Sequence, residues 1–174
     1  MQFDLKKSIE ILSRTPEVLK TQLSGLSEEW VHENEGEGTW SPYDIVGHFI
    51  HGEKTDWIPR MKIILSDKED KTFTPFDRFA QEAESEGKTI DDLLDEFAEL
   101  RNENLKTLKS TVLTAVEYSK TGIHPDFGEI NLEELLATWT AHDLVHLAQL
   151  NRVMARQYKD EIGPFKNYIS LLKD

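Results

Sequence analysis

Two histidines four residues apart, His142 and His146, have the spacing in this sequence that best suits chemistry. They lie in the segment Trp139–Leu150, where apolar residues recur with a helical period. Side chains four positions apart lie one above the other on the same face of a helix. The same face carries the main apolar stripe of the predicted helix. This stripe consists of Leu132, Leu135, Trp139, Leu150 and Val153. We therefore expect both imidazole rings to point into a core.

Burial of two neighbouring imidazoles costs free energy unless each ring nitrogen finds a partner. One divalent cation would satisfy both rings and would avoid placing two positive charges in an apolar seam. The pair therefore indicates half of a metal site. The alternative interpretation is a pair of hydrogen-bonded core or surface histidines, because this spacing needs structural context before it identifies a site.

A third ligand is available in the segment Ile45–Glu53, which contains His48 and His51. These two differ by about 60° around a helix axis, so one helix face can present either. We expect His48 to be the ligand because it lies beside Gly52 on the helical wheel, and a missing side chain there leaves room above the site. His51 is then expected to be partly exposed or to support a ligand.

Three neutral imidazoles from two helices would leave an open coordination position, which is typical of catalytic rather than structural sites. A metal ion in such a site lowers the pKa of bound water toward ~7 or binds a thiolate. Zinc and nickel are the divalent metals that best suit histidine ligands. We therefore predict a catalytic metal site formed by His48, His142 and His146.

Carboxylates near these histidines are the candidate catalytic groups. Glu53 would act as a base if its side chain reaches the mouth of the site. Asp143 or Gln149 would support the histidines of the last long helix. Asp44 could orient the ring of His48, although its place at a helix start favours a capping role.

Four helical segments are needed to position these residues. The first spans residues 4–24 and is interrupted at Thr15-Pro16. The second begins at Ser41-Pro42, runs toward Ser66 and should bend or break after Trp57, because Pro59 follows. The third begins at Thr89 and reaches about Val116, and the fourth follows a cap at Asn131 and runs from about Leu132 to Tyr158.

The connections are predicted from glycine, proline and charged residues. Residues 32–41 and 121–128 are expected to be loops, and no segment alternates long enough to require a sheet. Their histidines, His32 and His124, are therefore expected to lie outside the site. Residues 67–88 form a long connection with one short helix that could serve as a lid. The sequence predicts a single all-α domain over residues 1–174, a four-helix bundle with a short C-terminal helix after Gly163-Pro164.

Composition limits the possible partners. The 174 residues include no cysteine, so metal ligands must be histidine or carboxylate, and any thiol must come from outside the chain. The formal net charge of -13 opposes binding to nucleic acid. No apolar stretch is long enough to cross a membrane, and the charged start differs from a secretory signal. We expect a cytoplasmic protein that acts on a small molecule.

A second apolar row lies about 180° from the histidines on the fourth helix. It consists mostly of small residues, Ala137, Ala141, Leu144, Ala148 and Ala155. Small side chains allow another helix to approach closely, either within the bundle or from a second subunit. The row therefore makes a homodimer one possible arrangement.

The two histidine segments, Trp40–His48 and Trp139–Leu150, resemble the motifs of the DinB-like family, whose members are also described as metal-dependent hydrolases. The segments Leu12–Pro16 and Arg152–Tyr158 support the resemblance, which spans nearly the whole chain. It implies an up-down-down-up four-helix bundle and a metal triad at His48, His142 and His146.

The resemblance leaves the reaction open. Some relatives are similar to S-transferases that use bacillithiol, mycothiol or glutathione, and others are called hydrolases. Our leading hypothesis is a divalent metal that activates a low-molecular-weight thiol for attack on an electrophile. The first alternative is hydrolysis by metal-bound hydroxide, and the second is a metal-binding bundle without turnover.

Overall fold

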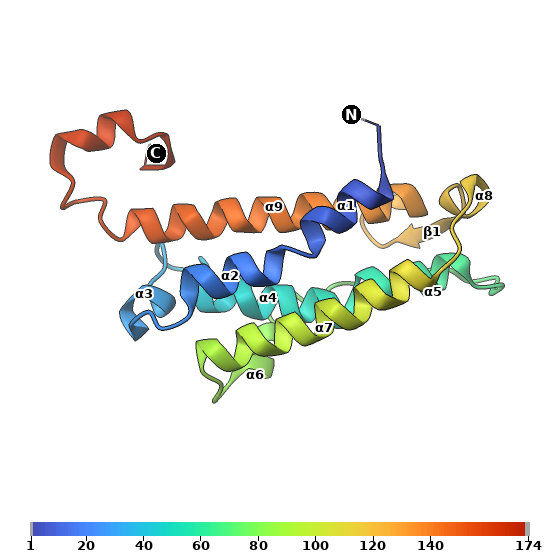
Figure 1. The fold of residues 1–174 in the computed structure, drawn as a ribbon, viewed down its shortest axis with the longest axis horizontal. Helices are drawn as coiled ribbons and strands as arrows, with labels where there is room; N and C mark the ends of the chain where they lie inside the picture. Colours follow the sequence, from blue (N-terminus) through green and yellow to red (C-terminus); the bar gives the residue numbers. More distant parts are fainter. Residues whose placement is uncertain (1, 173–174) are drawn as a thin grey trace.

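The computed structural model describes residues 2–172, and four helical rods form its body (Figure 1). The rods are α1 (Leu5–Leu12) with α2 (Thr15–Leu23), α4 (Pro42–Thr55) with α5 (Trp57–Leu65), α7 (Ile90–Ser110), and α9 (Leu132–Arg156). The second and third rods run in one direction, and the first and fourth run in the other. The predicted up-down-down-up bundle is therefore confirmed.

Capping boxes begin three of these helices. At the start of α4, the carboxylate of Asp44 accepts a hydrogen bond from the Ser41 backbone N–H at 2.9 Å, and the Ser41 hydroxyl oxygen accepts one from the Asp44 N–H. The same arrangement begins α7 at Thr89 and α9 at Asn131. Asp44 therefore caps its helix and does not orient His48.

The second rod breaks earlier than predicted. The break falls at Asp56, between the end of α4 at Thr55 and the start of α5 at Trp57. Pro59 consequently lies in the first turn of α5, where its missing N–H costs no intrahelical hydrogen bond. The prediction of a break after Trp57 was wrong by one residue, because the helix restarts at Trp57 so that proline falls in its first turn.

The predicted third helix also ends early, at Ser110 rather than near Val116. At this end, the hydroxyls of Thr111 and Ser110 donate to the Thr107 carbonyl oxygen at 2.8 and 2.9 Å. A separate short helix, α8 (Ala115–Tyr118), follows its own capping box at Thr114. The fourth helix ends at Arg156, two residues before the predicted Tyr158.

A β-hairpin replaces the loop that was predicted before the last long helix. The antiparallel strands β1 (Thr121–His124) and β2 (Gly128–Asn131) pair along their whole length. Strands of four residues are too short to show an alternating pattern in the sequence. Gly122 packs against α5 and the segment before α6, since a Cβ atom there would lie 2.6 Å from the ring of Phe73.

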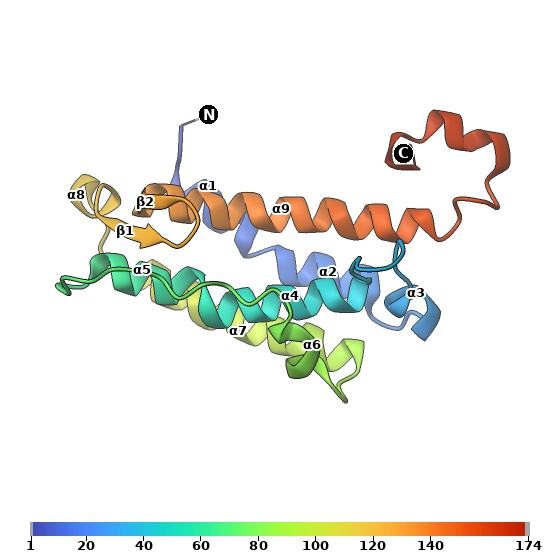
Figure 2. The same ribbon diagram turned by 180° about the vertical axis from the view of Figure 1, so that it is seen from behind.

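Shorter elements complete the described chain. They are α3 (Glu28–His32), α6 (Ala80–Ser85), and the 3-10 helices η1 (Gly163–Tyr168) and η2 (Ser170–Leu172). The short helix expected within residues 67–88 is α6. Figure 2 shows the segment between α5 and α6 running along α5 and α4, near the hairpin. Within the described residues, no helix is long and apolar enough to cross a membrane.

Two apolar clusters form the core. One joins α2, α4, α7 and α9 through residues such as Leu19, Phe49, Phe97 and Leu150. The other lies between α5, α7 and α9 and contains Trp57 and Trp139, whose rings stack with centroids 5.8 Å apart. The apolar stripe predicted on α9 is buried in these clusters. The candidate histidines lie between them.

Candidate metal centre

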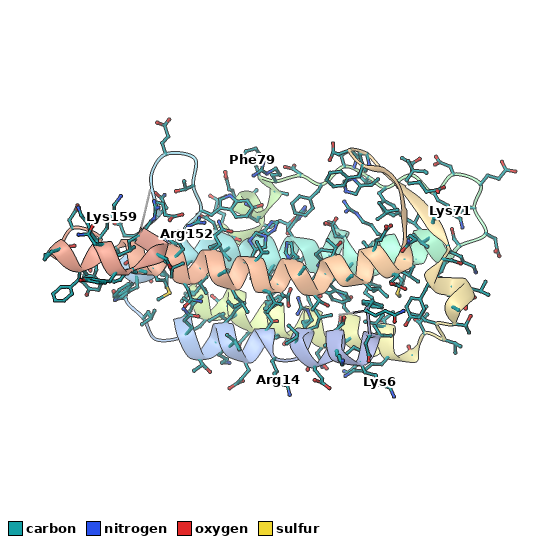
Figure 3. All side chains as sticks on the ribbon, turned by 90° about the horizontal axis from the view of Figure 1, so that it is seen from above. Lys6, Arg14, Lys71, Phe79, Arg152 and Lys159 are labelled. Atoms are coloured by element: carbon teal, nitrogen blue, oxygen red, sulfur yellow. The ribbon has the colours of Figure 1, made fainter. Side chains whose placement is uncertain are left out.

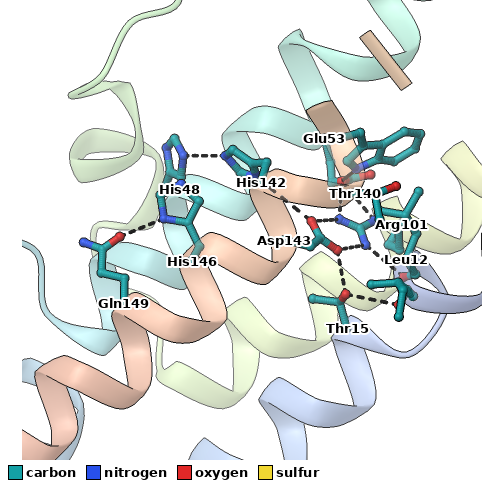
Figure 4. Close-up of polar contacts among 12 residues, drawn as sticks. Leu12, Thr15, His48, Glu53, Arg101, Thr140, His142, Asp143, His146 and Gln149 are labelled. Atoms are coloured by element: carbon teal, nitrogen blue, oxygen red, sulfur yellow. Dashed lines mark hydrogen bonds and ion pairs between the residues drawn. The ribbon is translucent and has the colours of Figure 1, made fainter. Parts of the chain in front are cut away.

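Helices α4 and α9 bring three imidazoles together: His48 from α4, and His142 and His146 from α9. One ring nitrogen from each histidine lies within 4.8 Å of the others. The Nε2 atoms of His48 and His142 are 2.9 Å apart (Figure 4). The helical spacing of four and the antiparallel packing of α4 on α9 thus place the three predicted ligands in one cluster.

Burial keeps two of these rings neutral. His48 is 7% exposed, and burial, followed by the nearby His142 and His146, lowers its pKa to about 2. Burial, followed by His142, lowers the pKa of His146 to about 4. Both rings are therefore uncharged at neutral pH, which is the state that metal ligation requires.

The hydrogen bonds of the rings fit a metal ion. The Nδ1 atom of His146 lies 2.8 Å from the Gln149 amide oxygen. Because this oxygen can only accept, Nδ1 carries the proton and Nε2 presents its lone pair. The Nδ1 atoms of His48 and His142 are buried and have no hydrogen-bond partner among residues 2–172. A cation shared by these rings would satisfy the facing Nε2 atoms of His48 and His142.

Aromatic side chains enclose the triad. The ring of Trp40 lies 4.6 Å from that of His48, and Phe76 approaches the same imidazole edge-on at 5.3 Å. Trp57 lies 5.0 Å from the ring of His142. These contacts remove water from the imidazoles, which helps to explain the low pKa values of His48 and His146 and strengthens electrostatic interactions within the site.

Asp143 lies directly after His142 on α9, but its carboxylate is directed at Arg101. The two form hydrogen bonds of 2.6 and 3.0 Å, and the Thr15 hydroxyl donates a third at 2.6 Å. Although burial opposes ionisation, Arg101 holds the pKa of Asp143 below its usual value. Its Oδ1 atom is 4.0 Å from Nδ1 of His142, which is beyond hydrogen-bond distance.

Glu53 occupies the other side of the same guanidinium. It is 2% exposed and accepts hydrogen bonds from Arg101 at 2.8 and 3.0 Å, from Asn104 at 2.9 Å and from the Trp139 indole at 3.2 Å. The structure therefore places Glu53 inside a buried network rather than at the mouth of the site.

Arg101 is the residue of this network that the sequence analysis missed. It is 1% exposed, and its guanidinium also donates to the Leu12 carbonyl oxygen at 2.8 Å. A signal was present, because Arg101 lies four residues from both Phe97 and Leu105 and therefore on the apolar face of its helix. A charged residue on such a face requires buried partners of opposite charge.

Two other expectations around α4 differ from the structure. His51 is 6% exposed rather than partly exposed, and its Nδ1 atom lies 3.0 Å from the Glu84 carboxylate. The space beside Gly52 is not open, because a Cβ atom there would contact the Trp57 indole at 3.4 Å. The break at Asp56 sets Trp57 against Gly52, and helix α6 brings Glu84 to His51. No local pattern specifies either contact.

Two cavities meet at His48. The larger has a volume of about 660 Å³ and polar walls that include Glu35, Arg78 and Arg152. The smaller, about 290 Å³, has mainly apolar walls and also reaches His142. Phe76 and His124 line both cavities, so the hairpin brings to the site a histidine that the sequence analysis had left out.

One wall of the larger cavity is held by an ion pair between distant segments. Arg152 of α9, labelled in Figure 3, donates to the Glu35 carboxylate at 2.6 Å. The guanidinium lowers the pKa of Glu35 through this hydrogen bond. The pair fixes the loop after α3 against α9 and places charged groups beside the triad.

Comparison with known proteins agrees with this fold. The model of the DinB superfamily matches residues 11–150. No curated protein matches the chain significantly. A solved structure, YfiT from Bacillus subtilis, is described as a probable metal-dependent hydrolase with an unusual four-helix bundle topology. It is similar with a TM-score of 0.70 and 22% identity, over 88% of this chain and 86% of that one. The chain therefore belongs to the DinB superfamily.

Proposed function

We propose that the protein is a divalent-metal-dependent enzyme whose ion is held by His48, His142 and His146. The observation that carries this proposal is the cluster of three imidazoles at the junction of two cavities, in which the Nε2 atoms of His48 and His142 face each other at 2.9 Å. A bound ion would supply a Lewis acid that polarises an oxygen or stabilises a thiolate. Histidine-only ligation favours zinc or nickel.

The reaction that we propose is transfer of a low-molecular-weight thiol to an electrophile. The pair of cavities supports two substrates, because the larger has charged walls that suit a hydrophilic thiol and the smaller has apolar walls that suit an electrophile. The chain contains no cysteine, so the nucleophilic sulfur would come from the bound thiol. Attack forms the carbon–sulfur bond, and the leaving group departs with the electron pair of the broken bond.

Hydrolysis is the second candidate. The description of YfiT as a probable metal-dependent hydrolase favours it, and in that case water would replace the thiol as the nucleophile. Either reaction gives the chain's own residues the same tasks. Gln149 keeps the proton of His146 on Nδ1, and the aromatic rings of Trp40, Phe76 and Trp57 exclude bulk water. We propose that Asp143 and Glu53 act as positioning residues through Arg101.

Metal content tests the ligand set. We expect purified protein reconstituted with zinc or nickel to hold one ion per chain in elemental analysis, and His142→Ala to lose it. His32→Ala is the matched control, because His32 pairs with Glu28 on α3 and contacts no residue of the triad. Unchanged metal content in His142→Ala would show that the ligand set is wrong.

Turnover separates the reactions. Chlorodinitrobenzene is incubated with metal-loaded protein and either glutathione, bacillithiol or mycothiol, and para-nitrophenyl acetate is incubated without thiol. Thiol-dependent release of chloride supports S-transfer. Ester cleavage that needs no thiol supports hydrolysis, and metal binding with neither reaction supports the non-catalytic alternative.

The proposal extends to a homodimer through the outer face of α9. Leu144 and Val145 are 49% and 62% exposed, and Ala141 and Ala148 beside them are also exposed. The bundle's own helices leave this part of the predicted row uncovered. A second copy of the chain would bury it.

A further inference from the structure

A buried arginine in the smaller cavity has no role in the proposed metal centre. Arg60 of α5 is 6% exposed and lines this cavity together with His48 and His142. Its Nη2 atom lies 2.9 Å from the Asp56 carboxylate, and its guanidinium lies over the Phe73 ring at 5.3 Å. The contact with Asp56 is an ion pair without hydrogen-bond geometry, since Nη2 has no hydrogen-bond partner among the described residues.

The Nη2 atom of Arg60 is buried and makes no hydrogen bond, and a buried donor without an acceptor is costly, because it has lost its hydrogen bonds to water. Burial accordingly lowers the pKa of Arg60. The same side chain faces a cavity with walls formed by Trp57, Phe127, Ile130 and Leu135. A ligand in this cavity can therefore supply the missing acceptor atom.

Charge around the cavity selects the kind of acceptor. Asp56 already balances the charge of Arg60, and Glu134 adds a second carboxylate to the wall. In the metal-free protein, a ligand carboxylate would approach these two anions and only one cation. A neutral carbonyl oxygen accepts from the guanidinium without that repulsion.

We propose that the smaller cavity binds small uncharged carbonyl compounds, such as amides, esters or ketones with an aromatic or branched aliphatic body, and that Arg60 donates a hydrogen bond to their carbonyl oxygen. These compounds are the substrate class that we propose for the metal site, and their conversion by the enzyme rests on the proposed function. The binding itself depends on residues of the chain alone.

Binding of three aromatic probes to metal-free, full-length protein tests this inference. Benzamide has a neutral carbonyl, benzoate has a carboxylate, and toluene has no acceptor. Saturation-transfer NMR and quenching of tryptophan fluorescence give their affinities, the latter because Trp57 lines the cavity. We expect benzamide to bind about tenfold more tightly than either of the other probes.

Two variants assign the effect to Arg60. Arg60→Met keeps an unbranched side chain in the cavity wall but removes its donors, and we expect benzamide affinity to fall about tenfold, to that of toluene. Lys62→Met is the matched control, because it removes a cation from an exposed position of the same helix. Asp56→Asn removes the balancing charge, and we expect the preference to shift from benzamide toward benzoate.

The outcomes separate this inference from the proposed function. Benzoate binding as tightly as benzamide to wild-type protein, or equal benzamide affinity in wild type and Arg60→Met, would overturn it, even if the metal-loaded protein is active. Arg60-dependent binding of benzamide without metal uptake would support it and reject the catalytic proposal. If Arg60→Met does not fold, the shift in Asp56→Asn decides, and an unchanged preference overturns the inference.

Discussion

His48 and His146 are basic side chains that the fold holds without charge. Their pKa values of about 2 and about 4 lie well below the usual histidine value of 6.5. At pH values below 6.5, the unfolded chain therefore binds protons that the folded, metal-free protein does not. Each histidine then reduces the free energy of unfolding by about 1.4 kcal/mol for each pH unit below 6.5, until the folded state also takes up the proton.

We therefore predict that metal-free protein loses stability as the pH falls from 7 to 5, and that His48→Asn loses less. The expected difference between the two proteins is about 2 kcal/mol, the contribution of one histidine over this window. Urea unfolding at both pH values measures it. An equal loss in both proteins would mean that His48 is protonated in the folded state.

Gln149 acts at the same scale, through the proton of His146. We predict that Gln149→Ala weakens metal affinity by about 10- to 100-fold, because His146 loses the acceptor that fixes its tautomer. Competition with a chromophoric chelator measures the affinity. Asn151→Ala is the control, because Asn151 lies on the same helix and contacts Gln22 instead. Equal affinities in both variants would refute this role for Gln149.

At the scale of elements, Arg101 connects the four rods. Its guanidinium contacts Leu12 at the end of α1, Glu53 on α4 and Asp143 on α9, and it lies over the rings of Phe97 and Trp139. Glu53 and Asp143 come from the two helices that carry the histidines. The network therefore sets how α4 and α9 pack on α7, and through that packing it positions the triad.

We predict that Arg101→Met lowers the free energy of unfolding by about 3–5 kcal/mol, because two buried carboxylates lose their counter-charge. Thermal and urea unfolding measure this change. Lys20→Met is the control, since the Lys20–Asp95 pair is exposed on both sides and its loss should shift the unfolding midpoint little. Similar effects of the two substitutions would show that the network is not stabilising.

At the scale of the whole molecule, the uncovered face of α9 predicts self-association. We expect wild-type protein to sediment as a dimer, and the double variant Leu144→Glu, Val145→Glu to sediment as a monomer with the same helical content and metal content. Charged residues would make burial of this face unfavourable. Analytical ultracentrifugation distinguishes the states, and a monomeric wild type would reject the dimer.

The sequence alone determined the helices and the faces of α4 and α9 that carry the histidines. Helical period and capping are local, so apolar residues such as Leu135 and Leu150, and caps such as Ser41, place the histidines on inward faces without knowledge of the fold. The tertiary structure decided what lies opposite those faces. Arg101 meets Glu53 and Asp143 across 48 and 42 residues.

The tertiary structure also decided three other features. They are the hairpin, the pairing of Glu53 with Arg101, and the two cavities. The hairpin brings His124 to the cavity walls, and the break at Asp56 sets Arg60 beside the triad's smaller cavity. These contacts join segments that are distant along the chain, and their formation depends on how the rods pack rather than on any local period. Local periodicity therefore specified the helix faces of the candidate histidines, whereas long-range packing specified their surroundings.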